Sequence, residues 1–385
     1  MNFKDKPSVW EIVKLFTRLG FTSFGGPAAH NALMEHEIVS KREWVDRQHF
    51  LDLIGITSLI PGPNSTELAM LCGFHRAGLA GLLAAGFCFI FPAVVITGTL
   101  AYFYLHYGNL PEIKPFLYGI KPAVIVIVLN AVYKLGSKAV KGWKLFSIGA
   151  AVAVINFMGV NEIYSILAGG LIGSFFIYLT EKKGTININF LLPFWGVFSA
   201  AYFLQNSQKV EVSLTKLFLV FLKIGAVLFG SGYVLVAYLD GELVRGLNWI
   251  TRQELLDAIA VGQFTPGPVL STVTFIGYQI AGISGALIAT AGIFLPSFIF
   301  VLIINPFVPK LRRSKIFSLF LDAVNISALA VMLVIGIKLG AEVLIDWRAI
   351  LIAILAGAAF LIIKKINSAY IVIGGALLGY LLSLL

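Results

Sequence analysis

The sequence predicts an all-α polytopic membrane protein, and three observations carry that prediction. Hydrophobic residues make up 58% of the 385 residues and charged residues only 12%, against about 25% charged in soluble domains. Apolar runs of about 20 residues, the length of a membrane-spanning helix, recur along the chain. A block of sequence also occurs twice, which predicts two inverted six-span repeats. A large soluble enzyme, a disordered chain and a disulfide scaffold are excluded.

The net charge is +10, from 29 Lys and Arg against 19 Asp and Glu. The basic residues lie in small groups between apolar runs, so they indicate membrane topology, and no nucleic-acid binding is expected. Both cysteines, Cys72 and Cys88, lie in apolar stretches and are expected to be free thiols. The chain has no Gly-Lys dipeptide and no metal-ligand spacing, so neither ATP, nor a metal, nor another cofactor is expected.

About thirteen apolar segments are expected to span the membrane. They lie at 9–35, 50–75, 78–105, 116–136, 143–159, 162–179, 190–204, 214–238, 254–278, 282–306, 316–337, 348–363 and 369–385. Lysine-rich clusters at 134–144 and 310–315 both fall on the cytoplasmic side if the chain starts inside and ends outside. The basic loop at 41–47 is an exception that this N-in, C-out orientation places outside.

An internal repeat divides the chain. Residues 16–63 align without gaps to residues 221–268, with 16 identities in 48 positions. The expected units are a first repeat at 1–185, a linker span at 186–210 and a second repeat at 211–385. Because a single span separates two six-span copies, the second copy is predicted to be inverted. Inverted repeats of this kind are typical of secondary transporters.

Each copy carries a Pro-Gly-Pro triplet inside an apolar segment, at 61–63 and at 266–268. The prolines remove backbone donors and clash with the preceding turn, so a helix break is predicted at each triplet. Broken backbone at membrane depth is tolerated where it faces protein or a watery cavity. The half-helix after each triplet would direct N–H groups and a positive dipole end towards an anion, with Asn64 and Ser65 beside the first. A simple kink that fits neighbouring spans is the alternative.

A second break is expected earlier in each copy, in FTRLGFTSFGGPAAH and in its partner FLKIGAVLFGSGYVL. Arg18 and Lys223 stand at equivalent positions there, and a cation within a span is costly and by default functional. Snorkelling of these side chains to the interface is the alternative. His30, after the glycines, is either a packed histidine or a proton carrier.

Acidic residues near the breaks are candidates for coupling or gating. Glu67 follows the first triplet, and it is either a proton site or the partner of Arg76 or another cation. Glu37 and Glu242 stand at equivalent positions after the first span of each copy. We interpret them mainly as caps or pairs between loops, and secondarily as gates.

At these residues the chain resembles the chromate ion transporter family. SFGGPAAH, the glutamates and tryptophan that follow it, the PGP triplet and FPAVV carry the resemblance, and the repeated FGSG, PGP and LP block resembles the family's second half. The resemblance covers nearly the whole chain and corresponds to the long, two-domain form. It implies a multi-pass transporter of the plasma (inner) membrane that carries chromate, with sulfate as a similar ion. Ser231 and Gly232 replace Gly26 and Pro27, so the second copy need not bind as the first does.

The expected function is export of chromate by a secondary transporter, driven by the membrane potential or a proton gradient. Uptake or exchange of sulfate or another oxyanion, and an anion channel, are the alternatives. No enzymatic activity is expected; the other expected partner is the lipid bilayer, and a homodimer is left open. The expected substrate site comprises Arg18, Gly25, Gly26, Pro61, Gly62, Pro63, Asn64, Ser65, Lys223, Gly230, Ser231, Gln263, Pro266, Gly267 and Pro268. Proton coupling or gating is expected at Glu67, His30, Glu37 and Glu242.

Overall fold

The computed structural model describes residues 9–108, 110–183, 211–230, 232–304, 314–363 and 366–384, so the expected linker span at 186–210 lies outside the described residues. Within those residues the regular structure is helical, without a β-strand. Among the described residues, five helices are long and apolar enough to cross a membrane: Asn64–Tyr107, Lys114–Ala139, Glu162–Thr180, Val269–Ile304 and Lys315–Val343. The chain is thus an all-α membrane protein. The number of spans and their orientation stay predictions.

Matching helices follow one another in the two copies. The first copy contains α1 (Val9–Thr22), α2 (Pro27–Met34), the π-helix η1 (Glu35–Lys41), α3 (Arg47–Thr57), α4 (Asn64–Tyr107), α5 (Lys114–Ala139), α6 (Trp143–Phe157) and α7 (Glu162–Lys183). The second contains α9 (Leu214–Val227), η3 (Gly232–Val234), α10 (Leu235–Leu239), the π-helix η4 (Asp240–Gly246), α11 (Arg252–Phe264), η5 (Val269–Ser271), α12 (Thr272–Ile304), α14 (Lys315–Val343), α15 (Trp347–Ile362) and α16 (Ser368–Ser383). The π-helix is a rare element. Each copy contains a π-helix that is seven residues long, and the two π-helices, η1 and η4, occupy equivalent positions in the aligned copies.

Both predicted breaks are present in each copy. α1 ends just before Gly25 and α9 just before Gly230, and these two glycines have φ angles of 100° and 105°. α3 and α11 end before the Pro-Gly-Pro triplets. These two helices also begin alike, because the side chains of Asp46 and Thr251 each accept a hydrogen bond from a backbone N–H in the first turn.

The long helices α4 and α12 each fold back on themselves at an Ala-Gly pair. Ala77 and Gly78 leave helical geometry, and Gly78 has φ 60° and ψ −145°, which a residue without Cβ tolerates best. The two arms of α4 then pack closely, with Gly73 against the backbone of Gly81. In α12 the same fold occurs at the matching pair, 281–282. Each fold lies where the sequence predicts a connection between two segments.

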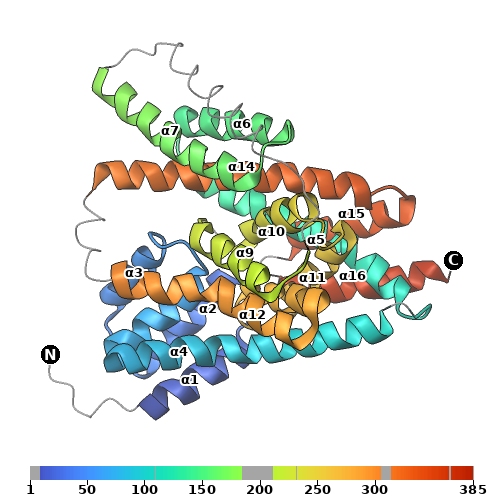
Figure 1. The fold of residues 1–385 in the computed structure, drawn as a ribbon, viewed down its shortest axis with the longest axis horizontal. Coiled ribbons are helices and arrows are strands. Elements are labelled where there is room, and N and C mark those ends of the chain that lie inside the picture. The colour runs from blue at the N-terminus through green and yellow to red at the C-terminus, as the bar shows by residue number, and fades with distance from the viewer. Residues whose placement is uncertain are drawn as a thin grey trace.

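The two copies pack around each other. α6 and α7 of the first copy pack on α14, and α15 and α16 of the second pack on α5 in the same way (Figure 1). The counterparts α5 and α14 run antiparallel, since Gly340 lies near Ile125 and Gly136 near Leu329. Inverted repeats place equivalent helices in opposite directions. The larger cluster of the hydrophobic core contains residues of both copies, whereas a second cluster belongs almost entirely to the first copy. A site at the interface of the copies draws residues from both.

Candidate functional site

The four helix breaks meet at one place, where two backbone hydrogen bonds link the copies. The N–H of Gly62 donates to the carbonyl oxygen of Leu228 at 2.8 Å, and the N–H of Gly267 donates to that of Ser23, also at 2.8 Å. Leu228 and Ser23 occupy equivalent positions in the aligned copies. Each Pro-Gly-Pro turn therefore contacts the first break of the other copy. We name this meeting point the crossing (residues 23–26, 61–67, 228–230 and 266–272).

The long helices of opposite copies leave little space at the crossing. A Cβ at Gly62 would meet the hydroxyl of Ser297 on α12, whereas a Cβ at Gly267 would lie 2.9 Å from Cβ of Ala93 on α4. Ala93 and Ser297 are equivalent, each one residue after a repeated proline. The two glycines also have φ angles of 143° and 90°. Close approach and a positive φ thus both require glycine in the triplets.

A polar set lies on the first-copy side of the crossing. His30 is 1% exposed and bridges the two breaks of its copy. Its Nε2 donates to the carbonyl oxygen of Ser23 at 3.1 Å, so its Nδ1 accepts from the Ser65 hydroxyl, also at 3.1 Å. Glu67 is fully buried, and its Oε1 accepts from the hydroxyl of Ser297 at 3.1 Å. These contacts connect the polar set to α12 of the second copy.

Three buried oxygen atoms of this region have no hydrogen-bond partner within the described part of the chain: Ser23 Oγ, Thr66 Oγ1 and Glu67 Oε2. Buried polar atoms are normally paired, so an unpaired group indicates a place for a water molecule or a ligand. In the second copy, Leu228 and Leu235 stand where the first has Ser23 and His30. The buried oxygen atoms of the crossing that have no partner among the described residues therefore come from the first copy.

The half-helix that begins at Asn64 directs its N-terminus to the crossing, as the sequence predicts. The N–H groups of Thr66 and Glu67 both donate to the carbonyl oxygen of Pro63, and Pro63 has no N–H of its own. The N–H groups of Asn64 and Ser65 therefore form the tip of the helix. In the second copy a single 3-10 turn, η5, precedes α12. Binding of an oxyanion at these ends stays a prediction.

The two predicted cations are each held by an acid of their own copy. Arg18 Nη2 lies 2.5 Å from Glu37 Oε2. Lys223 Nζ donates to both carboxylate oxygens of Glu242, at 2.8 and 2.9 Å. No hydrogen bond or ion pair among the described residues joins either cation to a triplet. The structure thus joins two predicted substrate-binding residues to two predicted gating residues, in equivalent pairs.

The other predicted site residues are placed as follows. Both triplets, Ser65 and Gln263 are buried, and Asn64 is partly buried. Gly25 lies near Asn367, and a Cβ at Gly26 would lie 3.0 Å from the hydroxyl of Tyr233. Gly230 lines a cavity of about 210 Å³ together with Lys138 and Asn325. Ser231 lies outside the described residues.

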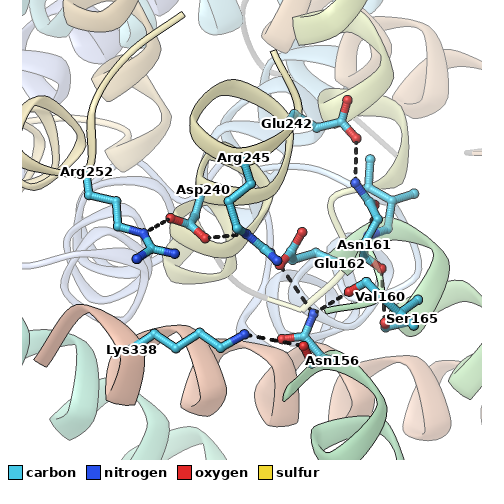
Figure 2. Close-up of polar contacts among 11 residues, drawn as sticks. Asn156, Val160, Asn161, Glu162, Ser165, Asp240, Glu242, Arg245, Arg252 and Lys338 are labelled. Carbon is cyan, nitrogen blue, oxygen red and sulfur yellow. Dashed lines mark hydrogen bonds and ion pairs between the residues drawn. The ribbon is translucent and has the colours of Figure 1, made fainter. Parts of the chain in front are cut away.

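A buried ion network links the copies at the start of α7 (Figure 2). Glu162 is 0% exposed, forms an ion pair with Arg245 of η4, and occupies the space beside Gly241. Arg245 Nε donates to Asp240 Oδ2 at 2.9 Å, and Arg252 Nε donates to Asp240 Oδ1 at 3.1 Å. Burial raises the pKa of Asp240, and the charge of Arg252 opposes that rise. The charged state of Asp240 thus depends on the neighbouring cation Arg252.

The same network reaches the predicted gating residue Glu242. Asn161, beside Glu162, donates from Nδ2 to Glu242 Oε1 at 3.2 Å. Glu242 therefore connects Lys223 of its own copy to the first copy. Ser40 stands in the first copy where the second has Arg245, so the sequence does not repeat this cation.

Sequence reasoning missed Ser23, Ser297, Glu162 and Arg245. Ser297 follows the repeated Pro296, which is the signal that could have found it. Glu162 is the first residue of the apolar segment 162–179, where an acid is favourable at the start of any helix, so its position carried no signal of a buried ion pair. For metals, the described residues contain no group of three His, Cys, Asp or Glu side chains that could hold an ion.

Comparison with known sequences identifies the family. The family model described as Chromate transporter matches residues 10–174 and 215–380. A chromate transport protein of Cupriavidus metallidurans is 30% identical over 375 residues, which cover 96% of this chain and 92% of the relative. A probable chromate transport protein of Synechococcus elongatus is also 30% identical, over 97% of this chain and 95% of its own length.

Shorter relatives match about one copy of the repeat. Two uncharacterized transporters of Bacillus subtilis match over 153 and 158 residues, which is 40% of this chain and 77% and 89% of their own lengths. No solved structure matches the chain. The two matched regions of the family model begin 205 residues apart, the offset of the internal repeat. On these matches, this chain belongs to the chromate transporter family.

Proposed function

We propose that the protein is a secondary transporter that carries chromate, or a similar tetrahedral oxyanion, across the plasma membrane and binds it at the crossing. The observation that carries this proposal is the meeting of four helix breaks from two antiparallel copies at one buried, partly polar place. Unwound backbone and half-helix N-termini between inverted repeats are where secondary transporters bind their substrates. The relatives named as chromate transport proteins support chromate as the substrate.

We propose export as the direction of transport. Moving a dianion outward from a negative interior yields about 2 × 2.3 kcal/mol per 100 mV, which corresponds to a gradient on the order of a thousandfold. ATP is not needed for accumulation of that size. The same energy opposes uptake, so import of sulfate would require a coupled cation.

Everted membrane vesicles test export directly. Respiration makes the lumen of such vesicles positive, so labelled chromate should accumulate inside them, and an ionophore that collapses the potential should release it. Vesicles without the protein are the control. Accumulation that ignores the potential would contradict electrogenic export. Unlabelled sulfate in the lumen separates the remaining alternatives, because trans-stimulation of chromate entry requires a carrier and is absent from a channel.

The charge assignment is tested by Arg18→Gln and Lys223→Gln. If these cations contact the oxyanion during the cycle, each substitution removes a hydrogen bond to a charged group, worth roughly 1.5–3 kcal/mol, and KM for chromate should rise by about tenfold or more. Lys14→Gln is the matched control, because Lys14 lies one turn earlier on α1 and packs over Trp10. Wild-type KM in both Arg18→Gln and Lys223→Gln would remove the two cations from the site.

A further inference from the structure

Glu67 is a fully buried carboxyl group of the crossing. Its side chain is 0% exposed; Oε1 accepts from Ser297, and Oε2 has no hydrogen-bond partner among the described residues. An ionised carboxylate buried in this way is costly unless a cation pairs with it. Whether a cation is present is therefore the first point to settle.

No ion pair to Glu67 is found within the described residues. α12, which supplies Ser297, and the neighbouring η5 carry no charged residue. His30, on α2, is engaged by Ser23 and Ser65, and Asp52 of α3 has an interaction of its own. The charged or titratable groups on α1, α3, α4 and α11 contact residues other than Glu67. Five of these contacts are ion pairs: Glu11 with Arg76, Arg18 with Glu37, Arg47 with Glu35, Arg252 with Asp240, and Asp257 with Lys121. The other three are ring contacts of Lys14 with Trp10 and of His49 with His75, and a hydrogen bond between Glu254 and Thr251.

The second copy shows that the acid is not part of the repeated framework. The alignment places the neutral Thr272 opposite Glu67, and Ala93 stands where Ser297 does. The Thr272 hydroxyl donates to the carbonyl oxygen of Val269 in its own turn, at 2.8 Å. The crossing therefore has a single buried acid, held by a serine from the opposite copy.

We infer that Glu67 binds one proton together with each oxyanion and that the two move across the membrane in the same direction. This inference rests on the proposed function, because it requires an oxyanion at the crossing. An ionised carboxylate and a dianion repel each other strongly where water is excluded. Protonation removes that repulsion and gives Glu67 an O–H that can donate to an oxyanion oxygen.

The sign of the coupling follows from this electrostatic relation. Two ligands that favour each other's binding are carried together, whereas exchange in opposite directions requires that they exclude each other. One chromate dianion with one proton moves one negative charge per cycle, where the anion alone would move two. The potential still favours export, but the gradient it supports per 100 mV falls from about a thousandfold for the free dianion to about fiftyfold. Where Glu67 is ionised in the empty carrier, the apparent affinity for the oxyanion should rise by up to about tenfold for each unit that the pH falls.

The test measures charge moved per anion. The purified protein is reconstituted in liposomes with a known gradient of labelled chromate, at a pH above neutrality, where chromate is a dianion. The potential at which the net chromate flux becomes zero is then measured, and it gives the charge moved per anion. The wild type should move one charge per anion, and Glu67→Gln, which holds a neutral group of the same shape, should move two and lose the pH dependence. Glu112→Gln, an exposed acid in the loop after α4, is the matched control and should behave as the wild type.

Ser297→Ala adds a second readout. Loss of its hydroxyl removes the hydrogen bond that favours the ionised form of Glu67, so the pH range of transport should shift upward while the ratio stays at one charge per anion. Two charges per anion in the wild type would overturn the inference and leave the proposed transport intact. Absence of any chromate flux in the wild type would overturn the proposed function itself. Because two charges per anion in the wild type overturns the inference by itself, the inference stays falsifiable if Glu67→Gln fails to fold, and Ser297→Ala then tests the assignment to Glu67.

Discussion

Gly267→Ala is expected to reduce chromate transport by about thirtyfold or more. At φ 90° an alanine is strained, and its Cβ would lie 2.9 Å from Cβ of Ala93 and 3.3 Å from the carbonyl oxygen of Gly20. Relief of these contacts must displace the turn and weaken the hydrogen bond from its N–H to Ser23. Strain and overpacking of this kind cost about 2–4 kcal/mol. Vesicle uptake measures the transport loss, and thermal unfolding in detergent measures the stability loss.

A rescue and a control make the Gly267 prediction specific. Ala93→Gly removes the methyl group that the new Cβ of Gly267→Ala would contact. The double variant should therefore regain the stability that overpacking costs. It should not regain the stability that the positive φ costs. Gly142→Ala is the control, because that glycine has extended backbone and no atom within 4 Å of its Cβ position. Wild-type uptake in Gly267→Ala would show that the crossing does not need its close packing.

The helix breaks could be predicted because their causes are local. Proline removes a donor and glycine permits a positive φ within a few residues of where each stands, so the two prolines around Gly62 favour a helix end locally. The partners across the crossing could not be predicted in this way. Gly62 bonds to the carbonyl oxygen of Leu228, and a backbone oxygen leaves no mark on the residue type that carries it. The hydrophobic pattern likewise predicts helices without predicting which copy covers α14.

The internal repeat contains a sequence signal for two of the ion pairs. Arg18 with Glu37 and Lys223 with Glu242 are opposite charges at equivalent positions in both copies, which is what a repeated ion pair predicts. Assigning the cations to the substrate and the acids to gates separated residues that the structure joins. Arg245 had no such signal, because Ser40 replaces it in the first copy. Symmetry thus reveals contacts that both copies share and hides those that only one copy has.

Arg245→Met is expected to lower the free energy of unfolding by about 3–5 kcal/mol, the range for removing one partner of a buried ion pair. Glu162 is 0% exposed and Asp240 is 1% exposed, and both use this cation. Asp240 keeps Arg252, whereas Glu162 is left without an ion pair among the described residues. The shift in thermal or denaturant unfolding of the protein in detergent measures the loss.

Lys141→Met is the matched control for Arg245→Met, because it removes a cation from an exposed pair. Lys141 Nζ lies 2.7 Å from Asp322, but its side chain is 59% exposed, and pairs of that kind contribute about 0–1 kcal/mol. If Arg245→Met and Lys141→Met lower the free energy of unfolding by the same small amount, the network at α7 contributes no more to stability than an exposed ion pair does.

The double variant Arg245→Met with Glu162→Gln separates a structural role of this network from a gating role. Removing both charges leaves no uncompensated ion, so most of the lost stability should return. The two residues belong to different copies, and an alternating-access cycle moves such copies against each other. If the network only supports the fold, the transport rate should return with the stability. If it opens and closes during the cycle, the double variant should be nearly as stable as the wild type while its rate of chromate transport stays changed.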